Sequence, residues 1–309
     1  MEAKNSNAKA VTWTCLLLLG CLVEARASDS GDIPHNTYFL IVSKARAIDS
    51  PILQQRGIDA SQKIAAVASE CLPQSKVTLL SEPIMTAREV RQEAFIERVT
   101  RQTVKQHLIK LAHSVSREDT VFIYTHTHGH PVQKRSSDRP GGMIISLPVL
   151  DPAHGGIISW KDYADLLLAI PARNMIVLTM TCFSGGLIDT LNDTAFSARW
   201  CNRQKHGRNL VILTSQNSLL TSGPIGINHE LINPFTFAVT TAFKGTPDGF
   251  PSRDGHDTRD GRITIGEFVD YVLTTTRETV SSQPRRPNTA QPQVTGSFDR
   301  NSVLFHCHK

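Results

Sequence analysis

The 309-residue chain lacks the compositional extremes that mark several protein classes. Aromatic residues make up 6% of the chain, and no basic run accompanies its mild net charge of +5, which argues against binding to nucleic acid. Its 6 cysteines are too few for a disulfide-held scaffold. Because 20% charged and 40% hydrophobic residues are ordinary for a globular protein, we expect a folded chain with a sizeable core.

Long apolar runs are also missing beyond the amino terminus, where the first 27 residues have the pattern of a secretory signal peptide. Lys4 and Lys9 precede an apolar run over residues 11–23, which is shorter than the roughly 20 residues that span a bilayer. Residues 25–27 then supply a small-x-small cleavage pattern. Alternatively, a bacterial lipobox ends at Cys21, which would carry a lipid anchor. Both patterns predict a secreted or periplasmic protein, and no later stretch predicts a transmembrane segment.

Cleavage after residue 27 would leave a mature chain with four cysteines, namely Cys71, Cys182, Cys201 and Cys307. An extracytoplasmic compartment permits disulfides, but spacing does not fix pairing among Cys71, Cys201 and Cys307, so a Cys201–Cys307 bond is one option. No linker composition separates two cores. We therefore predict that residues 28–309 form a single domain.

Continuous apolar runs alternate with amphipathic segments along this domain. The runs predict strands at residues 38–42, 77–80, 119–125, 175–178, 210–213 and 303–305. The helical patterns cover residues 52–72, 86–113, 159–170, 229–243 and 265–276, and two loop-like stretches cover residues 131–158 and 281–297. This alternation predicts an α/β fold of three layers, with a mostly parallel six-stranded sheet between helices on both faces.

Two of the predicted strands run into residues that suit thiol chemistry. The strand at 119–125 is followed by His126, His128 and His130, and the strand at 175–178 by Cys182 and a Ser-Gly-Gly sequence. In parallel sheets, catalytic groups lie beyond the carboxyl ends of strands. An imidazole can take up a thiol proton so that the thiolate attacks a carbonyl carbon. Gly129 would let backbone N–H groups approach a developing oxyanion.

These two motifs resemble the strand-plus-His-Gly and strand-plus-Cys-x-Ser-Gly motifs of the caspase–hemoglobinase group. That group contains caspases, metacaspases, legumain-like peptidases and the transamidase that attaches glycolipid anchors. The interval from His128 to Cys182 is close to the roughly 50 residues of caspases. The similarity covers about residues 37–280, and the signal peptide makes the chain most similar to the legumain-like branch (peptidase C13).

The resemblance implies a secreted cysteine peptidase that cleaves a protein or peptide substrate through a Cys-His dyad and a thioester. His128, the histidine that precedes a glycine, would be the general base, and Cys182 the nucleophile. The backbone N–H groups of Gly129 and Cys182 would bind the oxyanion. Transpeptidation would follow where an amine intercepts the thioester.

The same resemblance implies substrate contacts from Ser215 and Gln216, which follow the strand at 210–213, and from Arg56. The chain departs from many relatives at Met180, where they carry an acidic residue two positions before the cysteine. Specificity for a basic P1 residue is therefore not implied.

Two other functions fit parts of the pattern. His126, His128 and His130 alternate, so in an extended strand their side chains would share one face and suit zinc in a metallohydrolase. A non-catalytic caspase-like binding module would also keep both motifs.

A further pattern near the carboxyl end resembles an EF-hand loop, in which Asp257, Asp260 and Glu267 would bind calcium. The loop lacks acidic residues at positions where a regular EF-hand has them. Thr264 and Glu267 also form a capping-box pattern, which explains the glutamate without a metal. We therefore predict no cofactor and no metal ligands.

Overall fold

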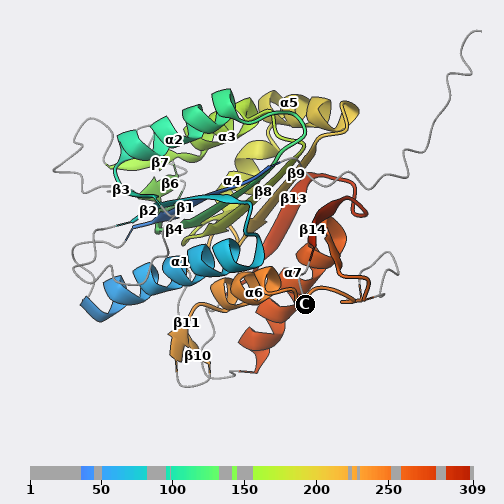
Figure 1. Ribbon diagram of the computed structural model, residues 1–309. Helices are drawn as coiled ribbons and strands as arrows, with labels where there is room; N and C mark the ends of the chain where they lie inside the picture. Colours follow the sequence, from blue (N-terminus) through green and yellow to red (C-terminus); the bar gives the residue numbers. More distant parts are fainter. Residues whose placement is uncertain are drawn as a thin grey trace, which may run out of the picture. The chain divides into compact units, whose positions relative to one another are not determined.

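A computed structural model defines the fold over most of the chain (Figure 1). The described residues are 36–44, 51–81, 95–97, 99–131, 141–144, 156–221, 225–227, 230–251, 259–282 and 290–306. They all belong to one compact unit, Ile33–Lys309. The other unit, Met1–Asp32, contains the predicted signal peptide and Cys21 and lies outside the described residues.

A 7-stranded sheet forms the centre of this unit, with strand order β13-β9-β8-β4-β1-β2-β3. Six of its strands are parallel, and β13 is antiparallel to β9. The strands are β1 (Thr37–Ser43), β2 (Lys76–Leu80), β3 (Phe95–Glu97), β4 (Thr120–His126), β8 (Asn174–Met180), β9 (Asn209–Thr214) and β13 (Gln293–Ser297). The α/β class and the mostly parallel sheet of the sequence prediction are confirmed.

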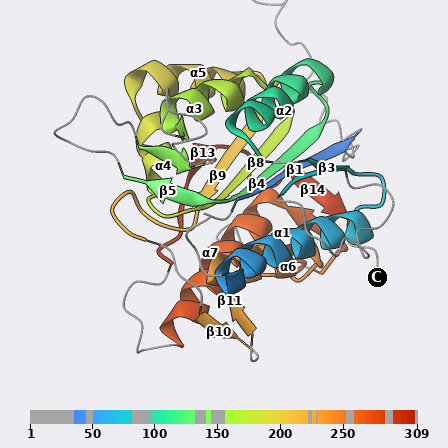
Figure 2. The same cartoon turned by 90° about the vertical axis from the view of Figure 1, so that its left-hand side faces the viewer.

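Helices cover both faces of the sheet, which gives three layers (Figures 1 and 2). One face carries α1 (Pro51–Cys71), α6 (Pro234–Phe243) and α7 (Ile265–Ser281), and the other carries α2 (Arg101–Ser114), α3 (Trp160–Ala169), α4 (Gly185–Leu191) and α5 (Thr194–Lys205). Side chains alternate between two cores along each strand. Phe122 and Tyr124 of β4 enter the core beneath α6 and α7, whereas Val121 and Ile123 enter the core beneath α2 and α3.

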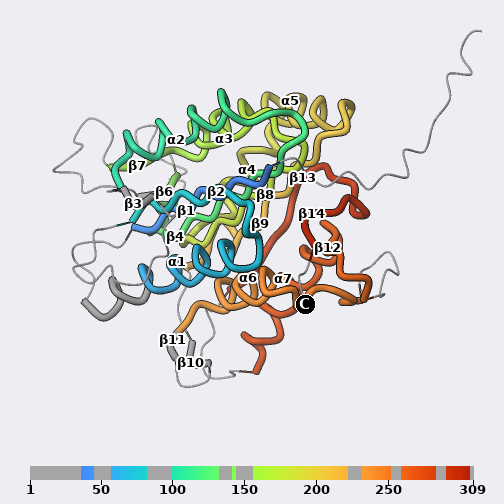
Figure 3. Tube along the Cα trace, viewed as in Figure 1, coloured from blue at the N-terminus to red at the C-terminus, as the bar shows by residue number. Residues whose placement is uncertain are grey.

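Smaller sheets lie outside the central one. Their strands are β5 (His128–His130), β6 (Gly142–Ile144) and β7 (Ile157–Ser159), then β10 (Ile225–Ile227) with β11 (Glu230–Ile232), and β12 (Arg262–Thr264) with β14 (Val303–His306). All pairs in these sheets are antiparallel. In the trace of Figure 3, the red β13 runs beside β9 and the chain then returns to β14.

Three predictions about the sheet need correction. The run at 303–305 is a strand, but β14 pairs with β12 and does not enter the central sheet. The sixth parallel strand is instead β3, which lies inside the stretch 86–113 of predicted helical pattern; α2 begins later in that stretch. In addition, β13 lies within residues 281–297, which were predicted to be a loop, because pairing with β9 outweighs the polar local sequence.

The helix predictions hold more closely. The helix predicted at 159–170 corresponds to α3, and Ser159 caps it by accepting a hydrogen bond from the Asp162 N–H. The helix predicted at 265–276 corresponds to α7 and extends further. The first residues of the stretch 229–243 are partly strand β11, and the predicted helical stretches do not include α4 and α5. Among the described helices, none combines the length and apolar character needed to cross a membrane.

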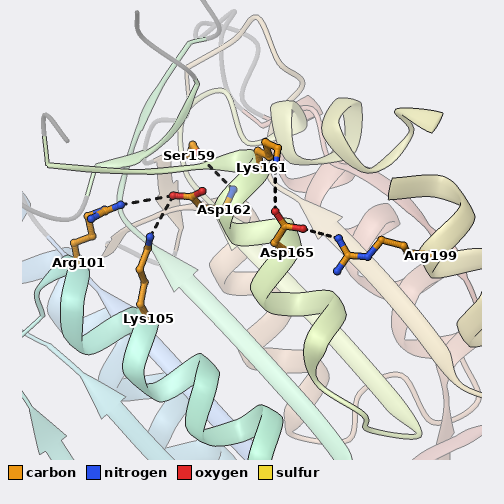
Figure 4. A network of polar contacts seen from close by, with 7 residues as sticks. All are labelled: Arg101, Lys105, Ser159, Lys161, Asp162, Asp165 and Arg199. Atoms are coloured by element: carbon orange, nitrogen blue, oxygen red, sulfur yellow. Dashed lines mark hydrogen bonds and ion pairs between the residues drawn. The ribbon is translucent and has the colours of Figure 1, made fainter. Parts of the chain in front are cut away.

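Ion pairs tie α2, α3 and α5 together on the outer surface (Figure 4). The Asp162 carboxylate lies 3.2 Å from the Lys105 ammonium and 3.6 Å from the Arg101 guanidinium. Asp165, one turn further along α3, pairs with Lys161 and with Arg199 of α5. Both aspartates are substantially exposed, so water and salt screen these pairs and each adds less than about 1 kcal/mol.

Candidate active site

The strands that carry the predicted dyad are neighbours in the sheet. In the β4–β8 register His126 faces Met180, the last residue of each strand. Just beyond, the Thr127 N–H donates to the Met180 carbonyl over 3.4 Å. His128 and Cys182 follow two residues after these paired positions, at the same carboxyl edge of the sheet.

The main chains of the two motifs touch at Gly129 and Cys182. A Cβ atom on Gly129 would lie 1.7 Å from the Cys182 carbonyl oxygen and 3.2 Å from its Cα atom. Only glycine fits at this position, because any side chain would push the two segments apart. The structure thus brings His128, the neighbour of Gly129, and Cys182 to one place on the sheet edge.

The peptide unit after Cys182 is held at both of its ends. The Thr181 hydroxyl donates to the Cys182 carbonyl over 3.0 Å, and the Phe183 N–H donates to the Leu220 carbonyl over 2.8 Å. Phe183 itself has a φ of 57°, in the left-handed backbone region that residues other than glycine rarely adopt. Such strain costs about 1–3 kcal/mol and is typical of functional loops. The bond from Thr181 to the carbonyl of the next residue has a counterpart in the histidine segment, where the Thr127 hydroxyl donates to the His128 carbonyl over 3.1 Å.

His126 is the innermost of the three histidines. Its ring packs against Gly57 of α1, and its Nδ1 atom is buried with no hydrogen-bond partner among the described residues. Burial, together with the nearby charge of His128, lowers the pKa of His126 to about 4. His126 is therefore neutral at physiological pH.

The alternation of the three histidines does not produce a metal site in the described part of the chain. There, no group of three or more His, Cys, Asp or Glu side chains is placed to hold a metal ion. The reason lies in the backbone, because β4 ends at His126 while His128 and His130 belong to β5, which pairs with β6. The ring of His130 bonds to the Pro131 carbonyl over 2.9 Å.

Ser215 and Gln216 follow β9 and lie beside the Cys182 loop, but both side chains are fully buried. The Ser215 hydroxyl donates to the Thr181 carbonyl over 3.4 Å, and the Gln216 carboxamide is bonded to main-chain groups. These bonds give both residues a structural role. The predicted substrate contacts from their side chains stay a prediction.

The remaining predicted site residues are placed as follows. Arg56 lies in α1, and its side chain is outside the described part of the structure. Met180 is 8% exposed and belongs to the core beneath α6 and α7. In the described part of the structure, Cys71, Cys182 and Cys201 are not in disulfides, so the optional bond from Cys201 is not formed, and Cys307 lies outside the described residues.

The part of the EF-hand-like pattern that the structure describes forms a helix cap. The Glu267 carboxylate accepts hydrogen bonds from the N–H and hydroxyl of Thr264, both over 2.9 Å, and from the Gly249 N–H over 3.3 Å. Asp260 accepts from the Arg262 N–H, whereas Asp257 lies outside the described residues. The capping-box interpretation of Glu267 is confirmed.

Sequence reasoning missed the contacts that hold the cysteine loop in place. Nothing in the sequence indicates that Leu220 binds Phe183 or that Phe183 is strained. The Gly-Gly sequence after Ser184 is the one feature that could have indicated close packing here, because a Cβ on Gly185 would lie 2.5 Å from the Ser218 nitrogen. Ser184 precedes α4, but its hydroxyl bonds Gln216 and makes no cap bond to the helix.

Comparisons with known proteins add a fold relationship. No protein-family model matches the chain, and no curated protein matches it significantly. Among solved structures it is similar to protein GSU0716 from Geobacter sulfurreducens, with a TM-score of 0.50 and 14% identity over 88% of this chain and 98% of that one. Raptor from Chaetomium thermophilum aligns over 67% of this chain and 17% of its own, with a TM-score of 0.38 and 15% identity. At these identities the GSU0716 similarity concerns the fold alone.

Proposed function

We propose that this protein is a secreted cysteine peptidase of caspase-like fold that uses Cys182 as nucleophile and His128 as general base. The contact between Gly129 and Cys182 carries the proposal, because it joins the histidine-bearing and cysteine-bearing strand ends. The doubly covered parallel sheet, the left-handed Phe183 and the sequence motifs support the same assignment. The signal peptide predicted in the first 27 residues supports action outside the cytoplasm.

The reaction divides into two acyl-transfer steps. His128 takes the Cys182 proton, the sulfur attacks the substrate carbonyl carbon, and the oxyanion forms against the backbone N–H groups of Gly129 and Cys182. The C–N bond then breaks, and the proton on His128 passes to the leaving amine. Water attacks the thioester in the second step, giving a carboxylic acid and the free thiol. An amine in place of water would give a new peptide bond.

Proteolysis of a peptide mixture tests this function directly. The purified protein and its Cys182→Ala variant are incubated with peptides derived from a whole proteome, and new termini are identified by mass spectrometry. We expect new cleavage sites that are absent with Cys182→Ala, while both proteins show the same unfolding transition. Equal cleavage by both proteins would contradict the assignment of Cys182. Failure of the folded wild-type protein to cleave any peptide would favour a binding module.

A further inference from the structure

Gln216 is a fully buried residue in which all four polar groups are bonded. Its N–H donates to the Ser184 hydroxyl over 3.1 Å, and its carbonyl accepts from the Thr214 hydroxyl over 3.0 Å and from Ser184 over 3.3 Å. Its side-chain Oε1 accepts from the Gln291 N–H, and its Nε2 donates to the Thr221 carbonyl, both over 3.0 Å. Gln216 therefore connects three other segments, Ser184 through its main chain and Thr221 and Gln291 through its side chain.

The bond to Thr221 continues toward Cys182. Leu220, the residue before Thr221, accepts the Phe183 N–H through its carbonyl over 2.8 Å. On the other side, the Leu219 N–H donates to the Asn217 side chain over 2.9 Å. The loop at 217–221 is thus fixed on both sides of the carbonyl that holds the strained residue after Cys182.

We propose that Gln216 is a positioning residue that sets the reactivity of Cys182 through the Thr221–Leu220–Phe183 connection. This inference rests on the proposed function, and it gives Gln216 a role other than substrate contact. A left-handed Phe183 persists only while its surroundings hold it. Loss of the Nε2 bond would release Leu220, allow Phe183 to relax and displace the thiol relative to His128.

The isosteric change Gln216→Glu separates the two side-chain bonds. When it is ionised, the carboxylate still accepts the Gln291 N–H but has no proton to donate to the Thr221 carbonyl. When the carboxyl group is protonated, its O–H can donate to Thr221 again. Burial raises the pKa of a carboxyl group, so the Thr221 bond is lost only at alkaline pH and is recovered as the pH is lowered.

The test measures the rate of Cys182 alkylation by iodoacetamide from pH 4 to 9 in the full protein. Exposed Cys201 serves as the internal reference thiol. We expect Gln216→Glu to lower the Cys182 rate about tenfold at pH 9, as loss of about one hydrogen bond implies, and to approach the wild-type rate at pH 5. The matched control Gln106→Glu makes the same change at an exposed position of α2 and should leave the rate unchanged.

A milder variant covers the case in which Gln216→Glu does not fold. Asn217→Ala removes the acceptor of the Leu219 N–H from a half-buried side chain and should lower the Cys182 rate by a smaller factor. Unchanged rates in a folded Gln216→Glu protein, or in Asn217→Ala if the former does not fold, would overturn the positioning role alone. A pH-independent loss in Gln216→Glu would also overturn it. Wild-type Cys182 reacting no faster than Cys201 would instead overturn the proposed function and the positioning role with it.

Discussion

Gly129 and Cys182 are packed so closely that no side-chain carbon fits between them: an added Cβ would lie 1.7 Å from the Cys182 carbonyl oxygen. The contact joins two segments that leave the sheet from neighbouring strands, β4 and β8. A glycine is required here by the space available, in addition to any use of its N–H group in catalysis. Substitutions at this position therefore test the geometry of the site.

Gly129→Ala should disrupt the dyad. The methyl group would force the two main chains apart, and a misplacement of about 1 Å can lower a reaction rate about a hundredfold. We expect the Cys182 alkylation rate at pH 7 to fall by that order. Gly57→Ala is the control, because its Cβ would meet only ordinary contacts at 3.6 Å and alanine favours a helix by about 1 kcal/mol. Equal rates in Gly129→Ala and wild type would contradict the close contact.

His126 should make the fold sensitive to acid. Its pKa is lowered to about 4 in the folded protein, against about 6.5 in an unfolded chain, so the unfolded state binds the proton more readily. Protonation of His126 therefore does not affect the free energy of unfolding above pH 6.5. As the pH falls toward 4, it lowers that free energy by up to about 3 kcal/mol. Urea unfolding at pH 7.5 and pH 4.5 should show a smaller loss for His126→Gln than for wild type. His113→Gln, at an exposed position of α2, should behave like wild type, and an identical loss in all three proteins would refute the prediction.

Glu267 should act as a cap and not as a calcium ligand. Glu267→Ala removes acceptors for Thr264 and Gly249, which should lower the free energy of unfolding by about 1–2 kcal/mol. Thermal unfolding followed with calcium and with a chelator should give the same Tm for the wild-type protein. A Tm that rises with calcium in the wild type but not in Glu267→Ala would restore the metal interpretation.

Two ion pairs should differ in their contribution because they differ in exposure. Asp162 is 42% exposed where it meets Lys105, whereas Asp270 is 9% exposed where it bonds Arg300. We expect Asp162→Asn to cost less than about 1 kcal/mol, and less still in high salt (Figure 4). Asp270→Asn should cost about 1.5–3 kcal/mol, as expected for a hydrogen bond to a charged group. Urea unfolding at two salt concentrations measures both, and equal costs would contradict this ranking.

The sequence predicted those elements whose local pattern agrees with their place in the fold. The runs that became β4 and β8 are continuously apolar because parallel strands are buried on both faces. By contrast, β3 has three residues within a helical pattern, and β13 is a polar edge strand with Val294 exposed. Their identity depends on pairing with β2 and β9, which local sequence does not encode.

The same distinction applies to the candidate site. The sequence could predict that the His128 and Cys182 segments lie at the same edge of the sheet. That prediction required the two strands, the resemblance, and the rule that catalytic groups lie beyond the carboxyl ends of parallel strands. No sequence feature predicts the hydrogen bonds around Gln216, because main-chain groups from other segments supply the partners of its side chain. The zinc hypothesis placed the three histidines in one strand, whereas β4 ends at His126 and His128 and His130 belong to β5.

The pH dependence of Cys182 alkylation in the wild-type protein and in His128→Ala tests the central claim most directly. The protein is treated with iodoacetamide from pH 4 to 9, and each modified cysteine is located by mass spectrometry. Cys201, which is exposed, and Cys71, whose pKa is raised by burial, provide references in the same molecule. The account predicts selective labelling of Cys182 below pH 7 that is lost in His128→Ala. Labelling of Cys182 only near pH 8.5, or unchanged in His128→Ala, would contradict it.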